Sequence, residues 1–129
     1  MTAYVDTNVL VRFVTGDHPT LTPHAEELLH GDQPLVLLPE VVLETAHVLR
    51  SRYEWPRSAV AEWLREIIGL PAIACDDVLL VTALDLHAEH HIDLPDALLA
   101  ATALLEGPPR VATFDRTLRR IEGLELVAT

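Results

Sequence analysis

Four acidic residues stand at positions where their side chains could bind a divalent cation: Asp6, Glu44, Asp96 and Asp115. Carboxylates that share one site repel each other, so they need either raised pKa values or bound cations to coexist. Mg²⁺ and Mn²⁺ prefer oxygen ligands and retain coordinated water. Two such ions about 4 Å apart would activate a water molecule and stabilise the leaving oxygen of a phosphodiester. The acids therefore indicate metal-dependent hydrolysis, with one or two ions.

Three aspartates also fit a simpler role as helix N-caps: Asp6, Asp93 and Asp115. A carboxylate at a helix start accepts hydrogen bonds from free backbone N–H groups, and the helix dipole favours its charge. With Asp93 as the cap, Pro95 takes an early helical position and Asp96 stays free in the first turn. Capping explains Glu44 poorly, because Glu44 lies inside a predicted helix, whereas Asp6 can serve in both roles.

Short apolar segments alternate with helical patterns along the whole chain. The predicted strands cover residues 2–5, 34–38, 72–74, 110–114 and 124–128, and the predicted helices cover 7–15, 22–31, 39–52, 56–69, 76–91, 93–107 and 115–121. Apolar strands separated by helices predict a mostly parallel central sheet with helices on both faces, which is a three-layer α/β/α sandwich. Because no linker or change in composition divides the chain, we expect one domain over residues 1–129.

The predicted elements direct three of the acids toward one edge of the sheet. Asp6 and Asp115 each follow a predicted strand, and Asp96 begins a helix. In open parallel sheets the ligand site lies beyond the carboxyl ends of the strands. Glu44 lies three residues after Val41, at the border of the apolar face of its helix. We therefore expect Glu44 to face the same site.

The composition excludes several kinds of chemistry. The chain has a formal net charge of −11, and its nine basic residues are all Arg. Without Lys there is no P-loop lysine and no Schiff base. Neither Ser51 nor Ser58 lies in a G-x-S-x-G motif, so an ordinary serine hydrolase is not expected. The acidic total argues against broad nucleic-acid binding through a basic face, but bound cations would still permit a polyanionic substrate.

The location of the protein is suggested by its cysteine content and apolar runs. The chain has a single cysteine, Cys75, which fits a reducing compartment. Its N-terminus lacks the basic and apolar regions of a secretory signal. No apolar run approaches the roughly 20 residues that a membrane-spanning helix needs. We expect a cytoplasmic protein that has no membrane partner.

Four motifs occur in order along the chain: "YVDTNVLVRF", "LLPEVVLETAHVLRSR", "HHIDLPDALLAATAL" and "VATFDRTL". Together they resemble the PIN-domain ribonucleases, and in particular the VapC-type toxins of type II toxin–antitoxin systems. The resemblance extends from Ala3 to about Leu126. It implies a PIN-like α/β/α fold and a Mg²⁺- or Mn²⁺-dependent endoribonuclease in which the metal-binding and catalytic acids are Asp6, Glu44, Asp96 and Asp115. It also places Asn8 and Thr113 beside these acids, where Asn8 could orient Asp6.

The resemblance has further implications for partners. It implies an RNA substrate, a homodimer, and a cognate antitoxin that covers the acidic groove and inhibits cleavage. A guanidinium from the antitoxin could replace part of the cation charge among the carboxylates.

Two other functions remain as alternatives. The first is a non-catalytic α/β protein-interaction module in which the acids serve only as helix caps. The second is a phosphatase with an aspartyl nucleophile, which would require an acid at the position of Asn8 and a Lys elsewhere. The chain has neither, so the interaction module is the stronger alternative.

Two clusters have no assigned role from sequence. The first contains His87, His90 and His91, whose spacing suits Zn²⁺ but also suits cations at a helix end. The second contains Arg116, Arg119 and Arg120. These arginines could guide RNA through its phosphates or could be ordinary solvated side chains.

Overall fold

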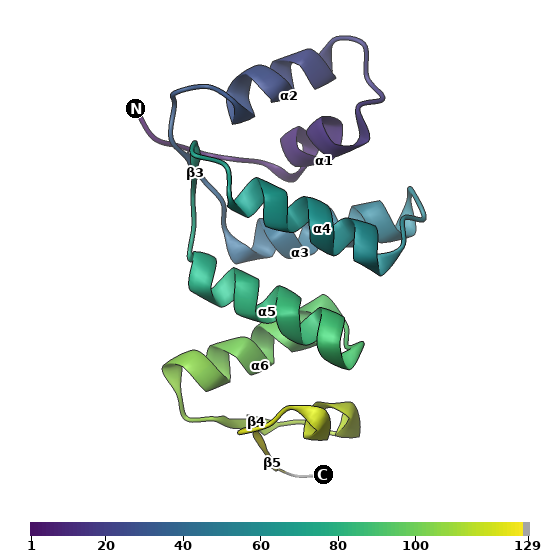
Figure 1. Cartoon of the computed structure of the whole chain (residues 1–129), viewed down its shortest axis with the longest axis vertical. Helices are drawn as coiled ribbons and strands as arrows, with labels where there is room; N and C mark the ends of the chain where they lie inside the picture. Colours follow the sequence, from purple (N-terminus) through teal and green to yellow (C-terminus); the bar gives the residue numbers. More distant parts are fainter. Residues whose placement is uncertain (128–129) are drawn as a thin grey trace. The chain divides into compact units, whose positions relative to one another are not determined.

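A computed structural model describes residues 1–127 of the protein (Figure 1). The chain divides into two compact units, with the boundary between Cys75 and Asp76. Ala128, the last residue of the predicted strand 124–128, lies outside the described residues. No helix in the described part of the chain is both long and apolar enough to cross a membrane.

The first unit is built from four helices and three strands. They are β1 (Ala3–Tyr4), α1 (Thr7–Thr15), α2 (Leu21–Leu29), β2 (Leu35–Val36), α3 (Pro39–Ser51), α4 (Arg57–Ile68) and β3 (Ile73–Ala74). The strands form a parallel sheet in the order β1-β2-β3, with Ala3 opposite Leu35 and Leu35 opposite Ile73. This arrangement agrees with the prediction of parallel strands joined by helices.

Local sequence signals set the helix ends of the first unit. Gly16 ends α1 in the left-handed region at φ 62°, and its N–H donates to the carbonyl of Arg12. That conformation strains residues with a Cβ, which is why glycine is common at such ends. Pro39 occupies the first turn of α3, where its missing N–H has no helical partner to lose. The helices bury a set of large apolar side chains that includes Leu10, Leu29, Leu49, Leu64 and Ile67.

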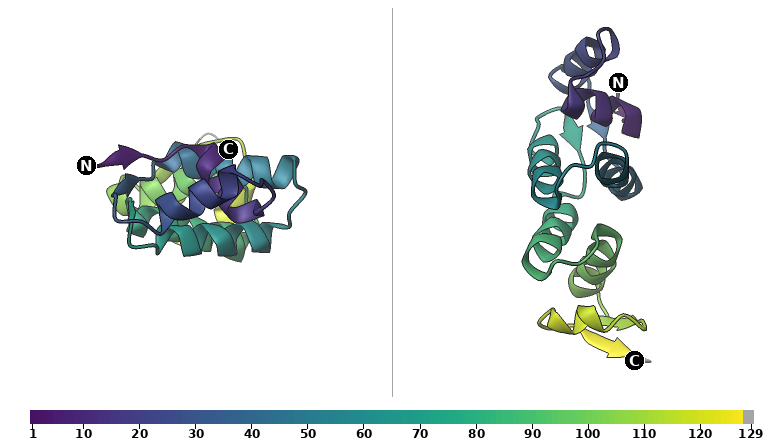
Figure 2. Two further views of the ribbon diagram at one scale, coloured as in Figure 1. Left: turned by 90° about the horizontal axis from the view of Figure 1, so that it is seen from above. Right: turned by 90° about the vertical axis from the view of Figure 1, so that its right-hand side faces the viewer.

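The second unit consists of two long helices followed by a small parallel β pair. Its elements are α5 (Asp77–His90), α6 (Leu94–Glu106), β4 (Arg110–Ala112), the 3₁₀ helix η1 (Arg116–Arg120) and β5 (Glu125–Val127). Helices α5 and α6 lie side by side, as the views in Figures 1 and 2 show. Strand β4 pairs with β5 so that Val111 lies opposite Leu126. Leu80, Leu84 and Leu118 are almost completely buried in this unit.

The elements occur in the predicted order, with differences at some ends. The second helix runs from Leu21 to Leu29 rather than over 22–31. Strand β4 ends at Ala112, and the predicted helix 115–121 is a 3₁₀ helix. The chain turns after β4 because the hydroxyl of Thr113 accepts a hydrogen bond from the N–H of Asp115 at 3.0 Å. Hydrogen bonds also link the described strands as a group of three and a group of two, one in each unit.

Candidate metal-binding acids

Asp6 acts as the N-cap of α1. Its Oδ1 accepts a hydrogen bond from the N–H of Thr7 at 2.8 Å, and its backbone is extended at φ −95° and ψ 154°. The side chain is exposed, and no described residue donates to its second carboxylate oxygen. Asp6 therefore caps a helix and retains one oxygen that is able to bind a cation.

Glu44 lies in the middle of α3 and is exposed. Within the described residues its carboxylate makes no hydrogen bond or ion pair, whereas the neighbouring Thr45 is buried and donates to the carbonyl of Val41. Helix α3 packs against α1, the helix that Asp6 caps. Glu44 thus has no evident structural role, which agrees with the difficulty of explaining it as a cap.

Asp96 lies in the first turn of α6 and is half-buried. Burial raises its pKa above the ordinary value of 3.8, and the charges of Asp115 and Asp93 raise it further. An Asp in the first turn of a helix is normally favoured in its charged form by the helix dipole. At Asp96 the loss of hydration and the neighbouring acids outweigh that effect.

Asp115 is held in a fixed conformation at the start of η1. Its Oδ1 accepts hydrogen bonds from the hydroxyl of Thr117 at 2.7 Å and from the N–H of Thr117 at 2.9 Å. These hydrogen bonds lower the pKa of Asp115, and the charge of Arg120 lowers it further. Thr117 was not among the residues predicted for the site. The signal that could have revealed it is the D-x-T pattern at a helix start, where a threonine two residues on can bond the aspartate.

Thr113 and Asn8, the two residues expected beside the acids, have different surroundings. The hydroxyl of Thr113 accepts a hydrogen bond from the backbone N–H of Asp115, so Thr113 supports the position of that acid. Asn8 lies in the first turn of α1 and is exposed, and no hydrogen bond joins it to Asp6 among the described residues. The expected contact of Asn8 with Asp6 therefore stays a prediction.

The structure brings Asp96 and Asp115 within electrostatic range of each other. Their pKa values shift in opposite directions because Asp96 is shielded from water and Asp115 accepts hydrogen bonds. A carboxylate pair with a raised pKa in one member is the arrangement that a bound cation would relieve. The oxygen donors of this pair also suit Mg²⁺ or Mn²⁺. These side chains therefore fit a hard divalent cation.

The four acids are divided equally between the units. Asp6 and Glu44 belong to the first unit, and Asp96 and Asp115 belong to the second. Within neither unit do three or more His, Cys, Asp or Glu side chains gather into a group that could hold a metal, as judged over residues 1–127. Each unit contains one pair of the predicted acids.

The histidine cluster at the end of α5 has a structural explanation for at least two of its members. The ring of His87 contacts the carbonyl of Ile92, and the carbonyl of His90 accepts a hydrogen bond from Arg120. His91 adopts the left-handed conformation at φ 54° that ends the helix. These contacts favour a role in ending α5, in agreement with the structural alternative for this cluster.

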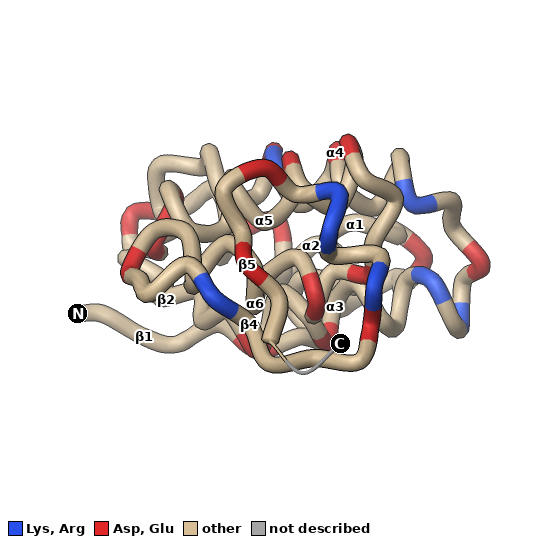
Figure 3. Tube along the Cα trace, turned by 90° about the horizontal axis from the view of Figure 1, so that it is seen from below, with Lys and Arg blue, Asp and Glu red and all other residues tan. Residues whose placement is uncertain are grey.

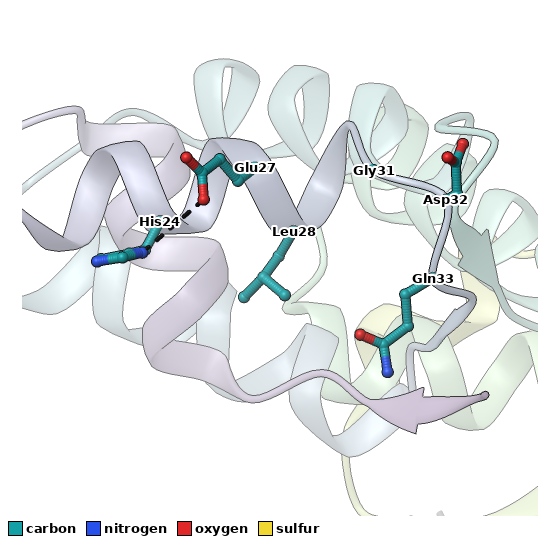
Figure 4. A pocket seen from close by; sticks show the side chains of 6 residues that line it. All are labelled: His24, Glu27, Leu28, Gly31, Asp32 and Gln33. Atoms are coloured by element: carbon teal, nitrogen blue, oxygen red, sulfur yellow. Dashed lines mark ion pairs between the residues drawn. The ribbon is translucent and has the colours of Figure 1, made fainter.

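A surface pocket at the end of α2 contains none of the predicted acids (Figure 4). Its lining residues are His24, Glu27, Leu28, Gly31, Asp32 and Gln33. His24 and Glu27 form an ion pair at 4.0 Å, and both side chains are largely exposed. The pocket does not show the buried polar groups of a reaction site, so the four acids remain the candidate site residues.

Comparison with known proteins assigns the family. None of the curated proteins compared with this chain matches it. The family model for the PIN domain matches residues 3–124, which include all four predicted acids. PIN domains are typically metal-dependent nucleases, and this match supports a nuclease role for the protein. The chain belongs to the PIN-domain family.

Proposed function

We propose that this protein is an endoribonuclease that requires Mg²⁺ or Mn²⁺ and that binds the cation through Asp6, Glu44, Asp96 and Asp115. The observation that carries the proposal is the Asp96–Asp115 pair, in which burial and a neighbouring charge raise the pKa of Asp96. The charged form of Asp96 is disfavoured in these surroundings, and a bound cation would favour it. When bound, the cation supplies a Lewis acid that activates water and neutralises charge at the phosphodiester.

Each acid has surroundings that suit a ligand. Asp115 is oriented by Thr113 and Thr117, and these contacts use only one of its two carboxylate oxygens. Asp6 likewise uses one oxygen to cap α1. Glu44 has no competing partner among the described residues. Fixing a ligand through a hydrogen bond on its far side reduces the entropy lost when a cation binds.

We propose that residues 1–129 form a single PIN domain. The family match over residues 3–124 covers sequence from both units, which supports this assignment.

A finer assignment follows from the motifs. We infer that the protein is a VapC-type toxin that acts on RNA in the cytoplasm, forms a homodimer, and is inhibited by a cognate antitoxin. The support is the resemblance of its four motifs, with their acids, to those of such toxins. Acidic residues outnumber basic residues along the chain (Figure 3), which agrees with an antitoxin that presents arginine to the acids.

A second function is favoured by one observation. Asp6 and Asp115 both accept backbone hydrogen bonds at helix starts, as caps do. A non-catalytic interaction module would need no more from these residues. It does not account for the raised pKa of Asp96, because a capping role would lower that pKa.

The test is cleavage of pooled RNA by the purified protein with Mg²⁺ or Mn²⁺, with EDTA as the metal-free control. We expect the wild type to cleave RNA and EDTA to abolish this cleavage. We expect the Asp6→Asn and Asp96→Asn variants to fold but not to cleave RNA. Asp32→Asn provides a matched control, because Asp32 is exposed and lies outside the proposed ligand set. Cleavage that persists in EDTA or in both site variants would refute the assignment. If no pooled RNA is cut, the interaction module is favoured where Mn²⁺ also fails to raise the melting temperature.

A further inference from the structure

Three of the nine arginines lie within η1, directly after Asp115: Arg116, Arg119 and Arg120. The proposed ligand set does not use them. RNA must nevertheless approach a protein with a net charge of −11, whose acids repel its phosphates. A group of guanidinium side chains next to Asp115 is therefore a candidate for attracting the RNA phosphates.

The fold turns these arginines outward. Leu118 is 1 % exposed and Ile121 is 3 % exposed, so they anchor η1 to the rest of the second unit. Thr117 is held by the carboxylate of Asp115. Leu118 and Ile121 thus face the interior and Thr117 faces Asp115. The three arginine side chains of η1 are exposed to solvent.

The three arginines differ in their contacts. Arg120 donates from Nη1 to the carbonyl of His90 at 3.2 Å, which joins η1 to the end of α5. Arg116 and Arg119 make no hydrogen bond or ion pair with the described residues. Arg110 in β4, by contrast, is paired with Glu125 at 3.2 Å. Both of these guanidinium groups thus stay unpaired within the described residues, although the chain has 20 acidic residues.

We propose that Arg116 and Arg119 bind phosphates of the RNA substrate beside Asp115. This inference rests on the proposed ribonuclease function. Guanidinium groups bind phosphate oxygens through two parallel hydrogen bonds, which gives orientation as well as attraction. Arg116 directly follows Asp115 in the chain, and Arg119 lies one turn of η1 further on. Arg120 is a positioning residue that holds η1 against α5 and does not contact the substrate.

The experiment measures RNA binding separately from cleavage. The full-length chain with Asp96→Asn serves as the non-cleaving parent, in EDTA, with a fluorescent single-stranded RNA longer than the roughly 4–16 nucleotides that a small domain covers. The dissociation constant is measured at several salt concentrations for the parent and for a double variant that adds Arg116→Gln and Arg119→Gln to the parent. We expect the double variant to bind the RNA roughly tenfold or more weakly than the parent at low salt. The slope of log K against log salt should fall by about 1.4, because each phosphate contact contributes about 0.7.

A control double variant changes the net charge by the same amount as the Arg116/Arg119 double variant. Arg50→Gln with Arg110→Gln removes two arginines that already have partners, the carbonyl of Trp55 and the carboxylate of Glu125. We expect this control to keep the slope of the parent. An equal loss of slope in both double variants would show a general effect of charge and would overturn the proposal.

The remaining outcomes separate the two hypotheses. If the parent binds RNA and the Arg116/Arg119 variant binds it with the same affinity and slope, the arginine proposal is wrong and the ribonuclease proposal is unaffected. Both proposals fail if the wild type does not cleave RNA and the Asp96→Asn parent does not bind RNA at low salt. Circular dichroism of each variant verifies that a loss of binding does not reflect unfolding.

Discussion

Asp96 and Asp115 lie near enough for the charge of Asp115 to raise the pKa of Asp96, while Thr117 lowers the pKa of Asp115. The two carboxyl groups come from α6 and from the turn before η1. Burial of Asp96 adds to the repulsion, so the charged form of this side chain is unfavourable in the protein without a cation.

Asp96→Asn should stabilise the protein when no cation is present. The substitution removes a half-buried charge and its repulsion from Asp115, and we expect the melting temperature in EDTA to rise by about 2–5 °C. Addition of Mn²⁺ should raise the melting temperature of the wild type more than that of the variant, because the variant lacks one proposed ligand. Thermal unfolding in EDTA and in Mn²⁺ measures both effects. A lower melting temperature of Asp96→Asn in EDTA would instead indicate a capping role.

The stability of the wild type relative to Asp96→Asn should depend on pH. The pKa of Asp96 is raised in the folded state above the ordinary value of 3.8, so the folded state binds a proton first as the pH falls. The ionised side chain destabilises the protein at neutral pH, and this effect should disappear as the pH falls through the raised pKa toward 3.8. Urea unfolding of both proteins in EDTA across this pH range measures the difference in their free energies of unfolding, and this difference should shrink as the pH falls. A difference that does not vary with pH would contradict it.

Thr117→Val should raise the pKa of Asp115 toward its ordinary value. The substitution removes the hydroxyl that donates to Oδ1 at 2.7 Å, although the N–H of residue 117 still donates. Asp115 stabilises the fold above the ordinary pKa of 3.8, and this contribution is lost as the pH falls through its lowered folded value. A carboxyl ¹³C NMR titration in wild type and variant reports the change. An unchanged pKa would mean that the hydroxyl does not influence this acid.

Thr113→Val should reduce nuclease activity or cation affinity roughly 10–100-fold, the usual effect of losing a residue that orients a ligand. The variant lacks the hydroxyl oxygen that accepts from the N–H of Asp115, so the turn carrying this acid becomes less well defined. Thr102→Val is a matched control, because Thr102 only donates to the carbonyl of Leu98 within α6. Titration with Mn²⁺ and single-turnover cleavage provide the comparison. Equal losses in the two variants would argue against a specific role for Thr113.

Glu44→Gln should abolish activity with almost no effect on stability. Glu44 is exposed and has no partner among the described residues, so its replacement should change the free energy of unfolding by less than about 0.5 kcal/mol. Loss of a direct ligand should reduce cleavage by more than about 100-fold. Glu40→Gln in the first turn of the same helix is the control and should remain active. Comparable activity of the two variants would exclude Glu44 from the site.

Much of the local structure could be predicted from the sequence because its causes are local. Gly16 ends α1, Pro39 begins α3, and Asp6 caps α1, as the residue types predict. Asp93 also occupies the N-cap position of α6, although its side chain does not make the capping hydrogen bond. The parallel strands follow from short apolar segments separated by helices. Neighbouring residues determine these features, so a single sequence contains the information.

The properties of the acids depend on contacts between residues distant in sequence, and only the tertiary structure decided them. The sequence marks Asp96 and Asp115 as candidates, but the raised pKa of Asp96 requires burial and a charge that lies 19 residues away along the chain. The contact of Arg120 with the carbonyl of His90 spans a longer separation and distinguishes Arg120 from Arg116 and Arg119. Loss of hydration and charge repulsion act through space, so the folded chain determines which acid has a raised pKa and which arginines lack a partner among the described residues.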